Sequence, residues 1–205
     1  MKKTTFAILA TILVLISIDT KAQIKKGEKM IGASLTFTSQ KIAFDDSDED
    51  SKLTTIIIAP QVGFGFGKNW VAGVGLGYAY EKANYTGTLN DMDASIFSGG
   101  VFLRKFFELN EKFGVYGQLD LSVGFGKGTG DGFTPFDVDV TTISGIVHPG
   151  FYFRPGNKLV IEAMFGRIGY TSTKRDYTVH YEDAKESSFE FSVTEGLSLG
   201  FKIIL

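Results

Sequence analysis

Five charged residues interrupt segments that otherwise alternate between small and apolar side chains: Arg104, Asp120, Glu162, Glu190 and Lys202. Charges on the inner face of a narrow pore either pair with one another or carry ions, and an unpaired buried charge is very costly. We therefore expect these five residues to form a structural network of salt bridges inside one interior. A path for protons or ions is the alternative hypothesis.

Two histidines, His148 and His180, are the candidates for acid–base catalysis. Ser144 shares a strand face with His148, but four residues of strand separate them by about 13 Å, which is beyond hydrogen-bond reach. His180 lies in a polar segment with tyrosines and acidic residues, where no triad can be derived from spacing. We predict no catalytic residues and no enzyme activity. A lipid-modifying enzyme is a distant third hypothesis.

Two other motifs suggest ligand sites, but neither matches the residue spacing of such a site. The acidic segment Asp45–Asp50 lacks the spacing and the turn glycine of a calcium loop, so it is interpreted as a solvated surface loop. The Gly-rich runs 63–67 and 124–130 do not match a nucleotide loop, and glycine in a barrel strand relieves crowding. There is no Cys. We predict no metal and no cofactor.

The N-terminus has the features of an export signal. Lys2 and Lys3 precede an apolar run, and Thr20 and Ala22 supply small residues at positions −3 and −1 of a cleavage site. The run is too short to span a membrane as a helix. We predict a signal peptide over residues 1–22 and one domain over 23–205. The formal net charge of −2 and the lack of a basic stripe give no case for nucleic acid.

Alternation with a period of two returns eight times after residue 22 and predicts eight β-strands. The predicted strands cover about 31–38, 55–66, 70–80, 95–107, 113–125, 142–154, 159–170 and 189–205. Short turns lie at 67–69, 108–112 and 155–158, and long polar loops at about 40–52, 81–93, 127–139 and 172–188. This pattern predicts an all-β, eight-stranded antiparallel up-and-down barrel. Tyr170 is assigned to the polar face of the seventh strand.

The sizes of the side chains decide which face points outward. One face carries Gly, Ser, Thr and a few charges, which fit the narrow bore of eight strands. The other face is bulky and apolar on every strand, so it faces lipid and makes the barrel transmembrane. Aromatic residues beside the short turns are predicted to lie at a membrane interface. They are Phe64, Phe66, Trp70, Phe113, Phe151 and Phe153.

Three stretches carry a resemblance to a known family: 59–67, 72–78 and 159–170. The chain resembles the small eight-stranded outer-membrane β-barrel proteins of Gram-negative bacteria, the outer membrane protein beta-barrel domain group. It is similar in architecture to outer-membrane proteins A and X. The resemblance implies a cell outer-membrane location and the barrel assembly machinery, outer-membrane lipid and lipopolysaccharide as partners.

Two functions remain open at this stage. The first is a structural or surface-interaction role, in which four long extracellular loops contact a surface ligand. The alternative is a narrow, porin-like channel for small solutes.

Overall fold

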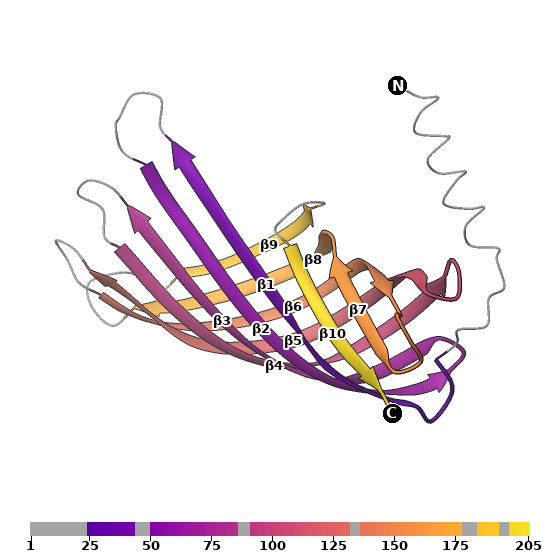
Figure 1. The fold of residues 1–205 in the computed structure, drawn as a ribbon. Coiled ribbons are helices and arrows are strands. Elements are labelled where there is room, and N and C mark those ends of the chain that lie inside the picture. The colour runs from indigo at the N-terminus through magenta and orange to yellow at the C-terminus, as the bar shows by residue number, and fades with distance from the viewer. Residues whose placement is uncertain (1–23, 44–49, 86–90, 132–135, 178–183, 193–196) are drawn as a thin grey trace, which may run out of the picture.

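The computed structural model describes residues 24–43, 50–85, 91–131, 136–177, 184–192 and 197–205. These residues form ten strand segments, which are drawn in Figure 1. The segments are β1 (Lys29–Ala43), β2 (Asp50–Gly67), β3 (Trp70–Tyr85), β4 (Asp91–Glu108), β5 (Phe113–Asp131), β6 (Phe136–Phe153), β7 (Leu159–Met164), β8 (Arg167–Tyr177), β9 (Ala184–Ser192) and β10 (Leu197–Ile204). All their pairings are antiparallel.

Eight of the segments close into a ring. Consecutive strands pair from β1 to β7, β7 pairs with β10, and β10 pairs with β1. The closing pair runs from Met30 opposite Ile204 to Phe37 opposite Leu197. The first and last described residues therefore lie at the same end of the barrel, which is also the end of the short turns (Figure 1). The predicted eight-stranded antiparallel barrel is confirmed.

The seventh predicted strand is interrupted, and this corrects one side-chain assignment. Gly150 pairs with Met164, whereas Val147 pairs with Ile168, so the β7–β8 side has one extra residue. Gly166 adopts a positive φ of 78° at this point. One inserted residue reverses the alternation of all that follow. The prediction that Tyr170 faces the bore is therefore wrong, because its side chain points outward and is 49% exposed.

The strands also extend well into the segments predicted as long loops. β1 continues to Ala43, and β5 and β6 remain paired up to Gly130 opposite Phe136. In these extensions polar and charged residues replace the outward apolar ones, as Asp137 and Asp139 do beside the buried Val138 and Val140. The outward apolar pattern that marks a membrane strand therefore ends before the strand does. Backbone pairing does not need outward apolar residues once that face stands in water. The predicted boundaries 40–52, 81–93, 127–139 and 172–188 are therefore too wide.

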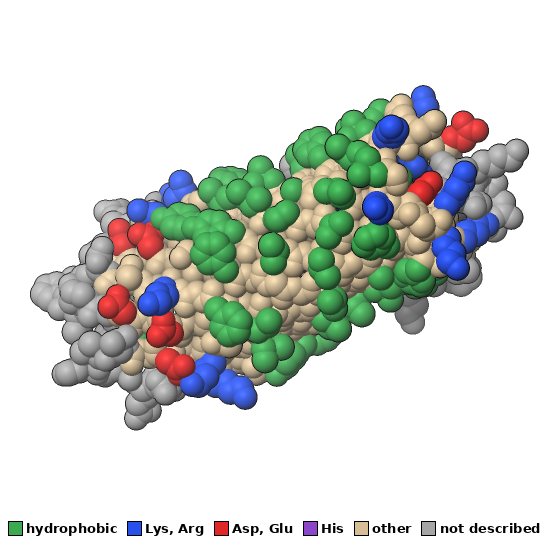
Figure 2. Space-filling view, turned by 90° about the horizontal axis from the view of Figure 1, so that it is seen from below, with side chains coloured by type: hydrophobic (Ala, Val, Ile, Leu, Met, Phe, Trp, Pro, Cys, Tyr) green, Lys and Arg blue, Asp and Glu red, His purple; other side chains and the backbone are tan. Residues whose placement is uncertain are grey.

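The outside of the barrel is an apolar belt, as Figure 2 shows for one face, with charged side chains gathered toward the two ends. Large hydrophobic side chains are exposed on every strand of the ring, and Leu76, Phe97 and Phe125 are each more than 60% exposed. An apolar surface that encircles a molecule is stable only in lipid. The pairing of β1 with β10 also joins the two edges of the eight-segment ring, which suits hydrocarbon, while β9 pairs with β8 alone in the described part of the chain. The chain is thus a membrane-spanning β-barrel.

The belt makes a prediction for Leu121, an outward residue of β5 that is 51% exposed. Leu121→Arg places a charge in hydrocarbon and should lower the free energy of unfolding by about 2–4 kcal/mol in lipid vesicles. Thr129→Arg is the matched control, because Thr129 lies on the same strand and face above the belt. Urea titration should show a change of about 0–1 kcal/mol for this control. Equal changes in the free energy of unfolding for the two substitutions would contradict the assigned position of the belt.

Candidate functional site

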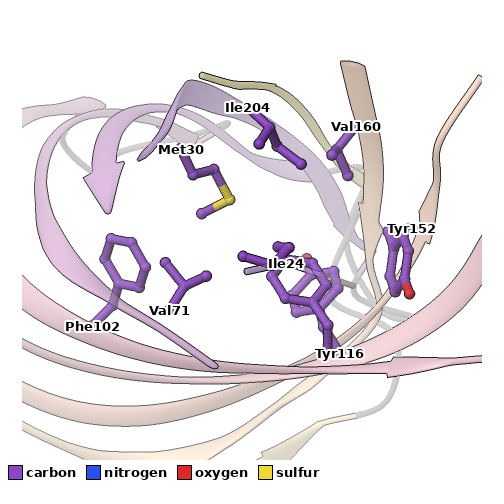
Figure 3. Packing of buried hydrophobic residues seen from close by; sticks show 9 residues of the cluster. Ile24, Met30, Val71, Phe102, Tyr116, Tyr152, Val160 and Ile204 are labelled. Carbon is purple, nitrogen blue, oxygen red and sulfur yellow. The ribbon is translucent and has the colours of Figure 1, made fainter. Parts of the chain in front are cut away.

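The lower bore is filled by a cluster that we call the apolar floor. It has nine buried members, eight of which are labelled in Figure 3: Ile24, Met30, Val71, Phe102, Phe106, Tyr116, Tyr152, Val160 and Ile204. Their side chains point from the surrounding strands toward the centre of the ring (Figure 3). Val71 and Val160 have no exposed surface. Phe106 packs edge-on against Tyr152, with ring centroids 5.1 Å apart. The floor closes the bore at the short-turn end.

A short segment before β1, which we call the strap (residues 24–28), completes the floor. The Ile24 amide donates to Asn69 Oδ1 at 3.0 Å, and the Asn69 amide donates to the Ile24 carbonyl at 3.2 Å. Asn69 has a φ of 61° in the tight β2–β3 turn, a conformation that Asn tolerates. The strap also needs Gly65, because a Cβ there would lie 2.3 Å from the Lys25 carbonyl oxygen. Ile24 is thereby fixed in the floor, 3% exposed.

Above the floor lies a layer of buried charge, which we call the ion layer (Arg104, Glu162 and Lys202). All three side chains are at most 3% exposed. Arg104 Nη1 donates to Glu162 Oε1, and Lys202 Nζ lies 4.0 Å from Glu162 Oε2. Arg104 Nε donates to Gln118 Oε1 at 2.6 Å, and Lys202 Nζ donates to Gln61 Oε1 at 3.2 Å. One carboxylate thus holds two cations, and two amides take up further donors.

Arg104 also joins the two levels. Its guanidinium carbon lies 4.6 Å from the ring centroid of Tyr116 and 5.5 Å from that of Phe106. Both rings belong to the apolar floor. A guanidinium group is planar and weakly hydrated, so it can stack on aromatic rings while it forms hydrogen bonds in its own plane. The charge is therefore covered from below by aromatic faces.

The other two residues predicted for the network lie apart from the ion layer. Asp120 is linked to it through Gln118, whose Nε2 donates to Asp120 Oδ1 at 2.7 Å. His148 Nε2 lies 3.7 Å from Asp120 Oδ2. Glu190 instead forms an ion pair with Arg167, 2.5 Å away, and both are more than a third exposed. The structure therefore brings three of the five together and separates Glu190.

The upper bore is open. Two adjoining cavities, of about 200 Å³ and about 410 Å³, share Thr36, Ile57, His148 and Met164 in their linings. Most of the remaining inward side chains there are small or hydroxyl-bearing. Some of the hydroxyls bond to each other across strands, as Thr36 Oγ1 does to Ser198 Oγ at 2.8 Å. The bore is thus a vestibule that opens at the loop end and is closed below.

The aromatic residues beside the short turns form outward-facing pairs. Phe66 and Trp70 have ring centroids 6.2 Å apart. Phe113 stacks on Phe153 at 4.6 Å, and Phe151 stacks on Phe165 at the same separation. Phe64 is 53% exposed on the same side. Such rings at the edge of the belt suit the boundary between hydrocarbon and headgroups.

The residues considered for chemistry do not form a catalytic group in the described part of the chain. Ser144 Oγ bonds to Ser122 Oγ at 2.7 Å rather than to His148. His180 and Asp45–Glu49 lie outside the described residues. Among the residues that are described, no group of three or more His, Asp or Glu side chains could hold a metal ion. That part of the chain contains no helix with the length and apolar character to cross a membrane.

The apolar floor was not predicted from the sequence. The sequence feature that indicates it is a set of bulky apolar residues at positions whose side chains should face a polar bore. Val71, Phe102, Phe106, Val160 and Ile204 all break the alternation in this way. They lie at the same end of their strands, next to the short turns. Interruptions of the alternation that recur at one level of a barrel therefore indicate side chains that fill the bore at that level.

The geometry defines the class of protein as a small, eight-stranded membrane-spanning β-barrel with a closed lower bore. No family model matches the chain, and no curated protein matches it in sequence. Among solved structures, the chain is similar to the outer membrane protein OprG from Pseudomonas aeruginosa. The identity is 12%, the TM-score is 0.49, and the match covers 90% of this chain and 98% of OprG.

Two further solved structures are similar at the same level. A major outer membrane protein from Thermus thermophilus has 8% identity and a TM-score of 0.48, with 87% of this chain and 99% of that chain covered. Neisserial surface protein A has 14% identity and a TM-score of 0.43, with 87% and 97% covered. The class follows from this chain's own strand pairing, belt and bore.

The ion layer makes a prediction for Glu162, the one carboxylate that contacts both buried cations. Glu162→Gln leaves Arg104 and Lys202 without a countercharge and should lower the free energy of unfolding by about 3–5 kcal/mol. Glu190→Gln is the control, because its pair with Arg167 is partly exposed and should contribute less than about 1 kcal/mol. Urea unfolding in lipid vesicles measures both. A loss below about 1 kcal/mol for Glu162→Gln would contradict a tightly coupled layer.

Proposed function

We propose that the chain is an integral outer-membrane barrel that does not conduct solutes and acts at the cell surface. The closed bore is the observation that carries this proposal. The apolar floor has members with no exposed surface, and the ion layer above it is at most 3% exposed. A solute entering from the loop end would meet paired charges and then packed aromatic rings. These features disfavour the alternative of a narrow channel.

The surface role is supported by the strand extensions above the belt. β1 to β6 and the β8–β9 hairpin continue beyond the last exposed apolar residues as paired sheet with a polar outer face. Cross-strand contacts stiffen these extensions, including Arg175 Nη1 to Glu186 Oε2 at 2.7 Å. Residues are best presented to a partner on a rigid scaffold. The proposed role is therefore contact with a surface ligand through the loop end.

The proposal includes the partners that the sequence suggested. Outer-membrane lipid and lipopolysaccharide surround the belt, and the barrel assembly machinery inserts the chain. The function is proposed to be non-enzymatic, because Ser144 and His148 point to different partners. It uses no cofactor. The predicted signal peptide over 1–22 accounts for export and lies outside the described residues.

The closed bore predicts the electrical behaviour of the purified protein. In planar bilayers it should give no stable open-channel steps, because no hydrated path crosses the floor. Replacing Phe102, Arg104 and Phe106 together by Ala thins both levels and should create a conducting pore. Heat-modifiable gel mobility verifies that each barrel is folded before it is measured. Sustained conductance by the unmodified protein would overturn the proposal in favour of the channel.

A further inference from the structure

The end of the barrel that carries the strap and the short turns is strongly basic. Eight cationic side chains lie there: Lys25, Lys26, Lys29, Lys68, Lys105, Lys112, Arg154 and Lys158. Only three acidic side chains accompany them in the same described segments: Glu28, Glu108 and Glu111. Glu28 already accepts the Lys25 amide at 2.9 Å, and Glu108 is buried. On the face shown in Figure 2, blue side chains gather at this end.

The opposite end has no such excess in its described strands. Above the belt, acidic residues outnumber cationic ones by nine to seven in the described strands. The cations are Lys41, Lys52, Lys82, Lys127, Lys174, Arg175 and Lys185, and the acids are Asp50, Glu81, Asp91, Asp93, Asp131, Asp137, Asp139, Asp176 and Glu186. Several of them are paired, as Lys174 is with Asp176 at 2.7 Å. The basic character is therefore a local property of the short-turn end.

The cations begin where the apolar belt ends. Lys105 lies opposite Trp70 in the β3–β4 pair, and its Nζ is 5.0 Å from the centroid of the Trp70 ring. Lys112 directly precedes the exposed Phe113, and Lys158 directly precedes the exposed Leu159. Long cationic side chains at a membrane boundary keep their stems on apolar surface and their charge among the headgroups. The charges thus stand at the level of lipid headgroups.

The arrangement of these cations indicates their partner. Each of the three short turns and the strap contributes at least one, so they form a ring around the rim beside lipid-facing aromatic residues. The nine side chains of the apolar floor between these cations carry no charge for a polymer bound beneath them. We propose that this ring binds the phosphate groups of anionic phospholipids in the leaflet on the short-turn side. Basic clusters at a membrane surface attract anionic lipid in this way.

Trp70 is the only Trp of the chain and lies within the ring, so its fluorescence reports the lipids nearby. The folded protein is placed in phosphatidylcholine vesicles that contain phosphatidylglycerol, and one lipid at a time carries brominated, quenching acyl chains. Anionic lipid should be enriched next to Trp70 roughly fivefold over its bulk fraction. The enrichment should fall as salt is raised. Equal quenching by the two lipids would overturn the proposal.

Matched variants separate the ring from general electrostatics. Lys68→Gln, Lys112→Gln and Lys158→Gln together should bring the enrichment close to one, while Lys105 is kept so that the surroundings of Trp70 do not change. Lys52→Gln, Lys127→Gln and Lys185→Gln together remove the same charge at the loop end and should leave the enrichment of anionic lipid unchanged. Loss of the enrichment in this control variant would overturn the proposal. If the first variant does not fold, the salt titration of the unmodified protein decides.

Two further experiments distinguish anionic lipid from other anionic ligands. Inorganic phosphate, compared with chloride at equal ionic strength, should not abolish the enrichment, because lipid presents many phosphates to the ring at once. Abolition would assign the site to free phosphate and overturn the lipid proposal. Purified cell-wall polymer should not co-sediment with the detergent-solubilised protein in a manner that depends on Lys68, Lys112 and Lys158. Such sedimentation, combined with equal quenching, would assign the ring to the wall.

Discussion

The structure depends on one constraint, which is that hydrocarbon offers no hydrogen bonds to a peptide backbone. A sheet that crosses lipid must therefore pair its edges, and here the pairing of β1 with β10 closes the ring. Closure fixes which face of each strand turns inward, so the sizes of the inward side chains set the content of the bore. Small residues leave a vestibule above, and bulky ones close it below. The belt, the ion layer and the floor all follow from this closure.

The closed lower bore shows how a buried charge is tolerated in so narrow a space. Glu162 neutralises Arg104 and Lys202, amide side chains take up remaining donors, and aromatic faces cover the guanidinium. Removing one partner would be costly, while the complete set leaves few polar groups unsatisfied. The same layer fills the bore directly above the apolar floor. The pairing of these charges and the filling of the bore therefore depend on the same three side chains.

The barrel could be predicted from the sequence because a strand with one face in lipid and one in the bore alternates apolar and small or polar residues. This alternation identified the outward position of Leu121, Phe125 and Phe201 and the inward position of Arg104 and Lys202. The outward apolar residues end where the strands leave the belt, so the strand extensions were predicted as loops. The alternation is also shifted by a single bulge, so Tyr170 was placed on the wrong face. The strap and the pairing of Glu190 with Arg167 could not be predicted, because both join residues whose contact is not indicated by the spacing of nearby residues.

The strap and the last strand meet at one place, with consequences for the order of assembly. The Lys29 amide donates to the Leu205 carbonyl and the Leu205 amide donates to the Lys29 carbonyl, while Ile24 enters the floor a few residues earlier. Contacts between such distant parts of a chain form late, since their loop entropy is lost before any gain arrives. The base of the barrel is filled only when the strap and β10 have come together. We therefore expect the lower bore to close late in folding.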